Sequence, residues 1–335
     1  RTLKETDYAP LTGVFDIKAR CWKTVFVGEG SVDAGGPFKE SLENIVEELM
    51  SDILPLFIPT QNNKNGHGLY QDCWTVNPAS TSSLHIEMFS FLGRLLGMSF
   101  NSGHCLDLKC PPMFWKQLAG LEVTLDDLQT SDLYATQIID ELKRDRNTYS
   151  AEEFNAALSL TFTTQLSNGE TVPVCEGGES RRVLHHDVDE YFRLILKTRT
   201  QESQKQMQAI RDGFSQTFPI GYLKLLTWKE VEERIRGPIE ISVATLKSIS
   251  DTPCDSDEYT KRFWRVFEQF TNEERSQFLK FAWGRSRLPP ADQLTLYPFR
   301  INLLESYNCS NPDLRLPTSQ TCFFTITLPR YSSDA

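Results

Sequence analysis

A helix that ends abruptly at Gly237 and Pro238 is the feature that most limits how this chain can fold. Thr227 and Glu230 form a capping-box pattern that begins the helix, which continues through Ile235. Gly237 supplies the left-handed residue that closes a helix, and Pro238 cannot continue it. Because 335 residues exceed what one compact core usually holds, we interpret this break as a boundary between two bodies.

The charge differs on the two sides of this boundary. The whole chain carries a net charge of −10, and residues 1–238 hold 24 Lys and Arg against 33 Asp and Glu. Residues 239–335 are almost balanced, with 11 basic and 12 acidic side chains. This acidity argues against nucleic-acid binding and suits basic protein partners. The most apolar segment, residues 88–100, is interrupted by Arg94 and is too short to span a bilayer, so we expect no membrane insertion.

The cysteines indicate a reducing compartment. Eight are present without the regular spacing of a disulfide framework, at positions 21, 73, 105, 110, 175, 254, 309 and 322. A chain of this size needs no disulfide to hold its core, so we expect reduced thiols and a cytoplasmic location. His104, Cys105 and Cys110 come closest to a metal pattern, but they lack a second ligand pair at zinc-finger spacing. We therefore predict neither a metal nor a cofactor.

Hydrophobic periodicity predicts that the first body is mostly helical. One helix follows residues 38–49, and a second, well-buried helix follows residues 84–96. A strand at residues 25–27 and a glycine-rich turn at 28–37 precede the first helix. The turn lacks the lysine and hydroxyl residue of a phosphate-binding loop, so we interpret it as structural. The polar residues 61–66 indicate a surface loop.

A small insert with its own hairpin is predicted further along the first body. Ser150 and Glu153 form a capping box for a short helix that ends at Leu158. Residues 160–164 and 172–175 are strand-like and are separated by an Asn-Gly turn, which is typical of a hairpin. A further helix begins at Asp187 and continues as a polar helix through residues 201–211.

The last third of the chain is predicted to be an α/β unit. One helix covers residues 263–270, and a second, which Thr271 and Glu274 cap, packs through Phe278, Leu279 and Phe281. Three strand-like segments follow, at residues 294–297, 301–303 and 322–328. This reading places Cys322 at the start of the final strand.

Cys322 is the strongest candidate for a reactive residue. It follows a proline-containing turn and the polar residues Ser319, Gln320 and Thr321, where a thiol can be partly exposed. The alternative is an ordinary buried cysteine. All five histidines precede residue 238, whereas a cysteine protease needs an imidazole beside the thiol. Thioester exchange needs no such group, because one thiolate displaces another of similar pKa. The pattern therefore favours acyl transfer over hydrolysis.

The segment around Cys322 resembles the catalytic loop of HECT-type ubiquitin ligases. The likeness is carried by Leu316–Phe323 together with Leu328–Ser333. Further matches fall in family order at residues 28–40, 208–214, 227–237 and 263–289. The resemblance covers nearly the whole chain, and the final loop is similar to that of the large HERC branch.

The resemblance implies an α+β, bilobal domain. A larger, mostly helical N-lobe over residues 1–237 contains an inserted subdomain at about 110–205, and a smaller α/β C-lobe covers residues 238–335. In this family the N-lobe recruits a ubiquitin-conjugating enzyme. The C-lobe accepts ubiquitin as a cysteine thioester and passes it to a lysine of a protein substrate. By resemblance, Cys322 is the nucleophile and Gly237-Pro238 is the hinge. The helix that binds the conjugating enzyme would carry Leu133, Tyr134, Ile138 and Leu142, whose alternative is ordinary helix core.

Two departures from the family pattern bear on activity. Gln320 stands where the family usually has a histidine two residues before the cysteine, and an amide cannot accept a proton as a base. Thr321 either forms hydrogen bonds around the thioester or simply begins the final strand. The family continues past the position of Ala335, so we expect a truncated C-lobe. The start at Arg1 likewise predicts a piece of a longer protein.

Two other function classes remain open at this point. The first is a non-catalytic scaffold that keeps the fold and binds ubiquitin or a conjugating enzyme without transferring anything. The second is a cysteine hydrolase that uses a histidine from the other body. Formation of a covalent adduct at Cys322 separates the scaffold from the other two.

Overall fold

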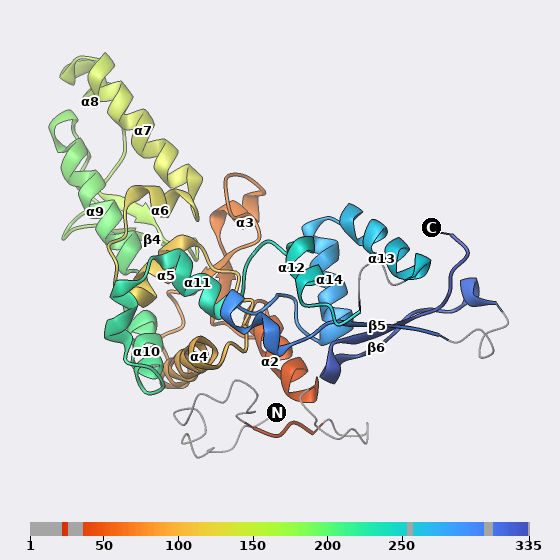
Figure 1. Ribbon diagram of the computed structural model, residues 1–335. Coiled ribbons are helices and arrows are strands. Elements are labelled where there is room, and N and C mark those ends of the chain that lie inside the picture. The colour runs from red at the N-terminus through yellow and green to blue at the C-terminus, as the bar shows by residue number, and fades with distance from the viewer. Residues whose placement is uncertain (1–21, 26–35, 253–256, 305–310, 334–335) are drawn as a thin grey trace. The chain divides into compact units, whose positions relative to one another are not determined.

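The structure is a computed structural model that describes residues 22–25, 36–252, 257–304 and 311–333 (Figure 1). It combines α-helices, short 3₁₀ helices and short strands, which confirms the predicted α+β class. The α-helices are α2 (Gly36–Leu49), α3 (Gln61–Asn65), α4 (Ser83–Ser102), α5 (Pro112–Ala119), α6 (Leu125–Gln129), α7 (Leu133–Thr148), α8 (Ala151–Ala157), α9 (Val188–Gln201), α10 (Gln204–Ser215), α11 (Trp228–Arg236), α12 (Val243–Ser248), α13 (Glu258–Gln269) and α14 (Asn272–Trp283). The 3₁₀ helices are η1 (His185–Asp187), η2 (Ile220–Leu225), η3 (Ala291–Leu296), η5 (Pro312–Leu314) and η6 (Thr321–Phe323).

The strands form three small sheets within the described residues. The strands are β1 (Phe57–Pro59), β2 (Trp74–Val76), β3 (Thr163–Gln165), β4 (Thr171–Pro173), β5 (Arg300–Leu303), β6 (Thr318–Gln320) and β7 (Thr325–Leu328). The pairs β1–β2 and β3–β4 are antiparallel ribbons. In the third sheet, of order β5-β7-β6, β7 is parallel to β5 and antiparallel to β6. The predicted strand at residues 25–27 and the turn at 28–37 lie outside the described residues, except for Val25, Gly36 and Pro37.

The chain divides into two compact units. Unit 1 contains the described residues up to Val46, then Met98–Asp107, and the chain from Glu232 onward. Unit 2 contains Glu47–Gly97 and Leu108–Val231. The predicted boundary between an N-lobe and a C-lobe stays a prediction. None of the helices in the described residues is long and apolar enough to span a membrane.

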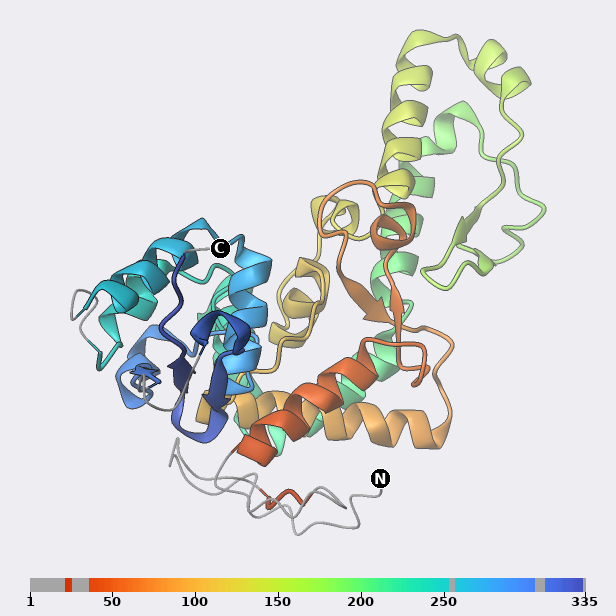
Figure 2. The same ribbon diagram turned by 90° about the vertical axis from the view of Figure 1, so that its right-hand side faces the viewer.

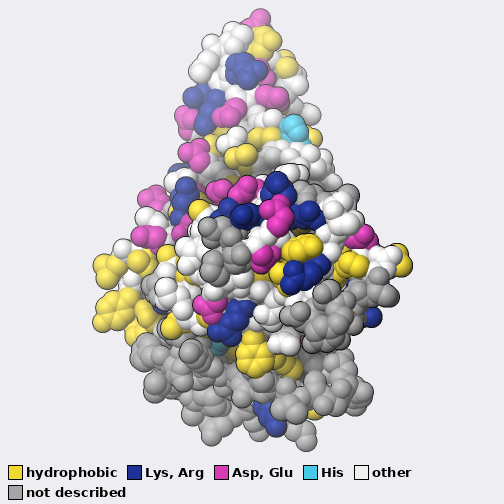
Figure 3. All heavy atoms as spheres, turned by 45° about the vertical axis from the view of Figure 1, so that its right-hand side comes forward, with side chains coloured by type: hydrophobic (Ala, Val, Ile, Leu, Met, Phe, Trp, Pro, Cys, Tyr) yellow, Lys and Arg dark blue, Asp and Glu magenta, His cyan; other side chains and the backbone are white. Residues whose placement is uncertain are grey.

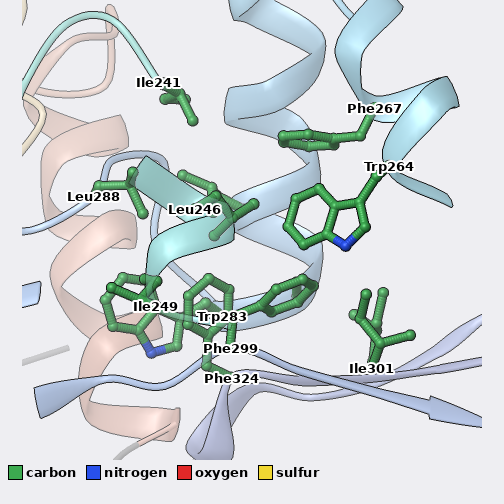
Figure 4. Packing of buried hydrophobic residues seen from close by; sticks show 13 residues of the cluster. Ile241, Leu246, Ile249, Trp264, Phe267, Trp283, Leu288, Phe299, Ile301 and Phe324 are labelled. Carbon is green, nitrogen blue, oxygen red and sulfur yellow. The ribbon is translucent and has the colours of Figure 1, made fainter. Parts of the chain in front are cut away.

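An aromatic core holds unit 1 together. Helices α13 and α14 and the sheet β5-β7-β6 surround it, and Trp283, Phe299 and Phe324 meet near its centre (Figure 4). The Trp283 and Phe324 rings stack, with centroids 4.4 Å apart and planes 11° from parallel. The buried members are Ile241, Leu246, Ile249, Trp264, Phe267, Leu279, Ala282, Trp283, Leu288, Phe299, Ile301, Phe324 and Ile326. The predicted α/β character of the last third is therefore found in this unit.

Unit 2 contains a second hydrophobic core among α7, α8, α9 and the β3–β4 ribbon, within the range predicted for the insert, and we call it the insert core. Helices α7 and α9 lie side by side in both views (Figures 1 and 2). The predicted capping box is present, since the Ser150 N–H donates to Glu153 Oε2 (2.9 Å) and the Glu153 N–H donates to Ser150 Oγ (3.3 Å). The insert core consists of Ile139, Leu142, Phe154, Phe162, Val174, Val183, Val188, Tyr191, Phe192 and Ile195.

A buried arginine ties α9 to the start of α7. Arg199 is 2% exposed, and its guanidinium donates to Asp132 Oδ2 (2.8 Å) and to Glu202 Oε2 (3.1 Å). Asp132 is also the N-cap of α7, where it accepts from the Ala135 N–H. The prediction of one continuous helix through residues 201–211 is wrong in detail, because α9 ends at Gln201 and α10 begins at Gln204.

Several sequence-based predictions are corrected by the structure. Residues 61–66 are not a plain loop, because Thr60 caps the short helix α3 and Gly66 closes it in the left-handed conformation. Residues 294–297 belong mainly to the 3₁₀ helix η3 instead of a strand. Phe281 is 41% exposed, whereas Ala282 and Trp283 are buried on α14.

The final strand also starts later than predicted. Cys322 lies in the 3₁₀ helix η6, and β7 begins at Thr325. The strand β6, which was not predicted, immediately precedes η6. Cys322 therefore lies in the tight connection between two antiparallel strands.

Two glycines allow α4 and α10 to pack with their backbones in contact. A Cβ on Gly93 would lie 1.9 Å from the Ile210 carbonyl oxygen, and one on Gly213 would lie 1.9 Å from the Ser90 carbonyl oxygen. Both approaches are shorter than any non-bonded contact that carbon and oxygen tolerate. The close crossing of these helices therefore depends on the absence of side chains at the two positions.

Gly213→Ala is expected to lower the free energy of unfolding by about 1–3 kcal/mol, the usual cost of overpacking. Gly221→Ala is the matched control, because a Cβ at Gly221 has no atom within 4 Å. Urea unfolding followed by circular dichroism measures both variants. Equal stabilities for the two variants would show that α4 and α10 do not need this contact.

Candidate active site around Cys322

The turn that carries Cys322 is held by buried neighbours on its C-terminal side. Cys322 and Thr321 are half-buried, Gln320 is exposed, and Phe323 is 61% exposed. Phe324 is fully buried and has a left-handed backbone (φ 48°), which is unfavourable for a bulky residue. The stacking of its ring on Trp283 offsets this cost. The turn is therefore anchored at Phe324 and open to solvent at Phe323.

The end of α14 supports the turn. Gly284 closes α14 in the left-handed conformation (φ 69°), and its Cβ position lies 3.8 Å from the Cβ of Thr321. Trp283, the last residue of α14, stacks on Phe324. Thr321 and Phe324, on either side of Cys322, thus both lie next to the end of one helix.

Two cations share the aromatic surface next to this turn. Lys39 Nζ lies 5.1 Å from the Trp283 ring centre and 5.9 Å from that of Tyr297. The guanidinium carbon of Arg285 lies 4.6 Å and 5.1 Å from the same two rings. Burial, and secondarily the charge of Arg285, lowers the pKa of Lys39 to about 7, while interaction with Cys322 acts in the opposite direction.

Sequence reasoning missed Lys39. It lies on a helix beside the buried Phe38, where a lysine ordinarily indicates the solvent-facing side. The aromatic partners that cover Lys39 come from residues 283–297, far away in the sequence. No local signal could therefore have identified it.

One histidine belongs to the same unit as Cys322. His104 is 4% exposed, and Arg285 Nη2 donates to its Nδ1 (2.9 Å), so that nitrogen is already occupied as an acceptor. Its ring also makes an edge contact with Phe38. Among the described residues, no hydrogen bond joins Cys322 to a histidine. This arrangement lacks the imidazole–thiol pair of a cysteine protease.

Cys322 differs from the other described cysteines. Cys73, Cys105 and Cys110 are buried, and only Cys175 shares the partial exposure of Cys322. Burial raises the pKa of Cys105 to about 11, so this thiol stays protonated at neutral pH. Within the described residues, no group of three His, Cys, Asp or Glu side chains is arranged to hold a metal ion.

The predicted hinge glycine lies in a tightly packed joint. Gly237 has φ 80°, and a Cβ there would lie 2.3 Å from the Leu288 carbonyl oxygen. Next to it, the buried Asp107 accepts from Arg236 Nη2 (2.7 Å) and pairs with Arg287 Nε (3.2 Å). Burial alone would raise the pKa of Asp107, but the two guanidinium groups outweigh it and hold that pKa below its usual range.

The four residues predicted to bind a conjugating enzyme do not share one environment. Tyr134 and Ile138 are 48% and 50% exposed, and both line a cavity of about 520 Å³ in unit 2. Leu133 is half-buried, whereas Leu142 is 6% exposed and belongs to the insert core. The cavity is also lined by β3 residues and by Leu160, Tyr191 and Ile195. Only Tyr134 and Ile138 thus offer large apolar surface to solvent.

Charged side chains are intermingled on one face of the molecule. In Figure 3, Lys and Arg side chains alternate with Asp and Glu side chains among the described residues of this face. Mixed charge gives only a weak field at a distance, because neighbouring opposite charges cancel.

Comparison with known proteins places the chain in a family. A family model described as "HECT-domain (ubiquitin-transferase)" matches residues 43–335. The chain is 38% identical to "E3 ubiquitin-protein ligase HERC2" of Mus musculus, over 93% of this chain and 6% of that protein, and the human HERC2 shows the same values. "E3 ubiquitin-protein ligase ptr1" of Schizosaccharomyces pombe is 28% identical over 92% of this chain and 9% of its own length.

These matches confirm the likeness to the HERC branch that the final loop indicated. The chain spans about 6% of the length of the HERC2 proteins, so the comparison concerns one domain of them. With a family model that covers most of its length and relatives that match nearly all of it, the chain belongs to the HECT-domain family.

Proposed function

We propose that this domain is a ubiquitin transferase that carries ubiquitin as a thioester on Cys322. The observation that carries the proposal is the half-buried thiol in a turn anchored through Thr321 and Phe324, within a HECT domain. Its partners would be a ubiquitin-conjugating enzyme, ubiquitin and protein substrates. The five described cysteines are free thiols, which suits the reducing cytoplasm.

The loading step needs little from the protein besides placement of the thiol. The Cys322 thiolate attacks the thioester carbonyl on the conjugating enzyme, and a new C–S bond forms while the carbonyl electrons move to oxygen. When those electrons return, the old C–S bond breaks and the conjugating enzyme leaves as a thiolate. No proton has to be transferred, which fits the absence of a histidine hydrogen-bonded to Cys322 in the described residues.

The supporting residues next to the thiol would act as hydrogen-bond donors. Gln320 is exposed two residues before Cys322, and its amide can donate to the thioester oxygen but cannot accept a proton as a base. Thr321 is half-buried and carries a hydroxyl that can donate in the same way. Deprotonation of the substrate lysine would then fall to an acidic residue elsewhere.

Gln320 also favours a second candidate function. Without the usual histidine, a HECT fold can serve as a scaffold that binds ubiquitin or a conjugating enzyme and transfers nothing. Binding and transfer are separable in experiment, because only transfer leaves a covalent bond on Cys322.

Mixing the domain with a ubiquitin-charged conjugating enzyme is expected to give an adduct that reducing agent removes. Cys322→Ala should abolish the adduct, whereas Cys175→Ala, at the other half-buried described cysteine, should leave it unchanged. Non-reducing gel electrophoresis with and without dithiothreitol measures this. An equal adduct on Cys322→Ala would overturn the proposal, and binding without any adduct would favour the scaffold.

The conjugating enzyme would bind at the cavity lined by Tyr134 and Ile138. Both side chains are half exposed on α7, and large exposed apolar residues beside a cavity are typical of a protein contact. Leu133 borders this surface, while Leu142 would support it from the core.

Tyr134→Ala and Ile138→Ala are each expected to weaken loading about tenfold at low conjugating-enzyme concentration, as loss of about 1.4 kcal/mol of contact predicts. Loading at saturation should be unchanged, because the thiol is untouched. Tyr149→Ala is the control, since Tyr149 is 53% exposed but does not line the cavity. Loading rates against enzyme concentration measure the effect. A loss at saturation would place these residues in another role.

Gly237 and Pro238 would form the joint between the two lobes. The positive φ of Gly237 and its close approach to Leu288 restrict this position to glycine. Because only glycine is tolerated at this position, the chain would turn here. The contacts around Gly237 would then decide which relative orientation of the two lobes is populated.

Gly237→Ala is expected to lower the free energy of unfolding by more than Gly177→Ala does, by about 1–3 kcal/mol. Both glycines have a positive φ, but a Cβ on Gly177 has no atom within 4 Å. The comparison therefore separates the contact with Leu288 from backbone strain. Thermal unfolding of both variants measures it, and equal losses would show that the joint is not tightly packed.

A further inference from the structure

Two buried cations without a carboxylate partner lie beside the turn that carries Cys322. Lys39 and Arg285 are 8% and 4% exposed, and among the described residues neither lies within ion-pair distance of a carboxylate. Arg285 Nη1 is buried and has no hydrogen-bond partner in the described part of the chain. Burying a charge without a counter-charge is unfavourable, so the arrangement calls for an explanation.

The two cations and the turn share one aromatic support. Lys39 Nζ and the Arg285 guanidinium both lie over the rings of Trp283 and Tyr297. The Trp283 ring also stacks on Phe324, two residues after Cys322, and a Cβ built on the next residue, Gly284, would lie 3.8 Å from the Cβ of Thr321. In this arrangement the positive charges lie on the rings that support the turn, and Cys322 contributes to the electrostatic environment of Lys39.

A purely structural role does not account for this arrangement. An apolar side chain in place of Lys39 would fill the same space over Trp283 and Tyr297 without a buried charge. The position of Lys39 is thus unfavourable for stability, and such positions are common where charge serves a reaction.

We propose, building on the transferase function above, that Lys39 and Arg285 stabilise the negative charge that develops at Cys322 during loading. In that step one negative charge moves from the Cys322 sulfur to the carbonyl oxygen and then to the departing sulfur. Fixed positive charges beside this path lower the energy of each charged state, most strongly where water is excluded. Lys39 and Arg285 act through their field and need not touch the reacting atoms.

The charge of Lys39 would respond to the reaction. Because its pKa is about 7, roughly half of the Lys39 side chains are charged at neutral pH. Negative charge at Cys322 favours the charged form of Lys39. The groups that face Lys39 are Arg285 at the end of α14, Tyr297 after η3 and Cys322 in η6. On α2 itself, Glu43 follows one turn later and binds Ser286 instead.

Lys39→Met tests the proposal, because methionine keeps the aromatic contact and removes the charge. We expect about tenfold slower single-turnover loading, with Lys39→Arg retaining most of the rate. Lys247→Met is the matched control, since Lys247 lies over Trp264 in the same unit and pairs with Glu268. Lys39 is chosen over Arg285 because Arg285 also binds His104.

A second measurement does not depend on ubiquitin. Alkylation of Cys322 by iodoacetamide at pH 7, followed by peptide mass mapping, should also slow in Lys39→Met and not in Lys247→Met. If the transferase proposal is wrong but the role of Lys39 is right, the wild type will form no ubiquitin adduct, while Lys39→Met will still be alkylated more slowly than the wild type. Unchanged alkylation and loading in Lys39→Met would overturn the role of the cation itself.

The thermal stability of Lys39→Met shows whether the charge of Lys39 serves the reaction or the packing of the fold. The folded-state pKa of Lys39 lies below its unfolded value of 10.5, so burying the charged form destabilises the fold below pH 7, and this cost fades as pH rises toward 10.5. Lys39→Met is therefore expected to raise Tm at pH 6 while slowing loading, with a smaller rise in Tm at pH 9. A lower Tm at pH 6 together with slower loading would show a packing role instead and contradict the proposal.

Discussion

Trp283 connects the core of unit 1 to the turn that carries Cys322. One interaction, its stacking on Phe324 at 4.4 Å, draws the turn onto the end of α14 and stabilises the left-handed backbone at Phe324. The same ring, with Tyr297, carries Lys39 and Arg285. Trp283 thus contributes to three features of the site. It helps to place the thiol, it stabilises the left-handed backbone at Phe324, and it supports the two cations.

This arrangement supplies what the thioester exchange that we propose requires. Such a reaction needs a placed thiol and a favourable field more than it needs an acid or a base, because the leaving group is itself a thiolate. Unit 1 supplies placement through Phe324 and Gly284, and field through buried cations. The half-exposed sulfur, in contrast to the buried thiol of Cys105, then lies where a large protein partner can reach it.

Buried polar groups hold the segment around Gly237 in one arrangement. Asp107 pairs with Arg236 and Arg287, which come from segments far apart in the chain. Such a cluster adds little net stability but is costly to break, because removal of one member leaves a buried charge unpaired. The packing around Gly237, whose backbone angles suit only glycine, is therefore specific in its geometry.

The sequence by itself determined the family and the helical and strand segments with strong local signals, and it singled out Cys322 as the candidate thiol. Capping boxes at Ser150, Thr227 and Thr271 begin helices where predicted, because caps involve residues three apart in the chain. The loop around Cys322 carried the family resemblance, because its matching residues are contiguous and can be read directly from the sequence.

Only the tertiary structure decided which of these residues share an environment. It placed Leu142 in a core and Tyr134 at a cavity, showed that residues 294–297 belong mainly to a 3₁₀ helix, and set Lys39 over the ring that supports the turn of Cys322. Each of these outcomes depends on contacts between segments distant in sequence. Burial and electric field are set by such non-local packing, whereas local patterns report only which backbone conformation a short segment prefers.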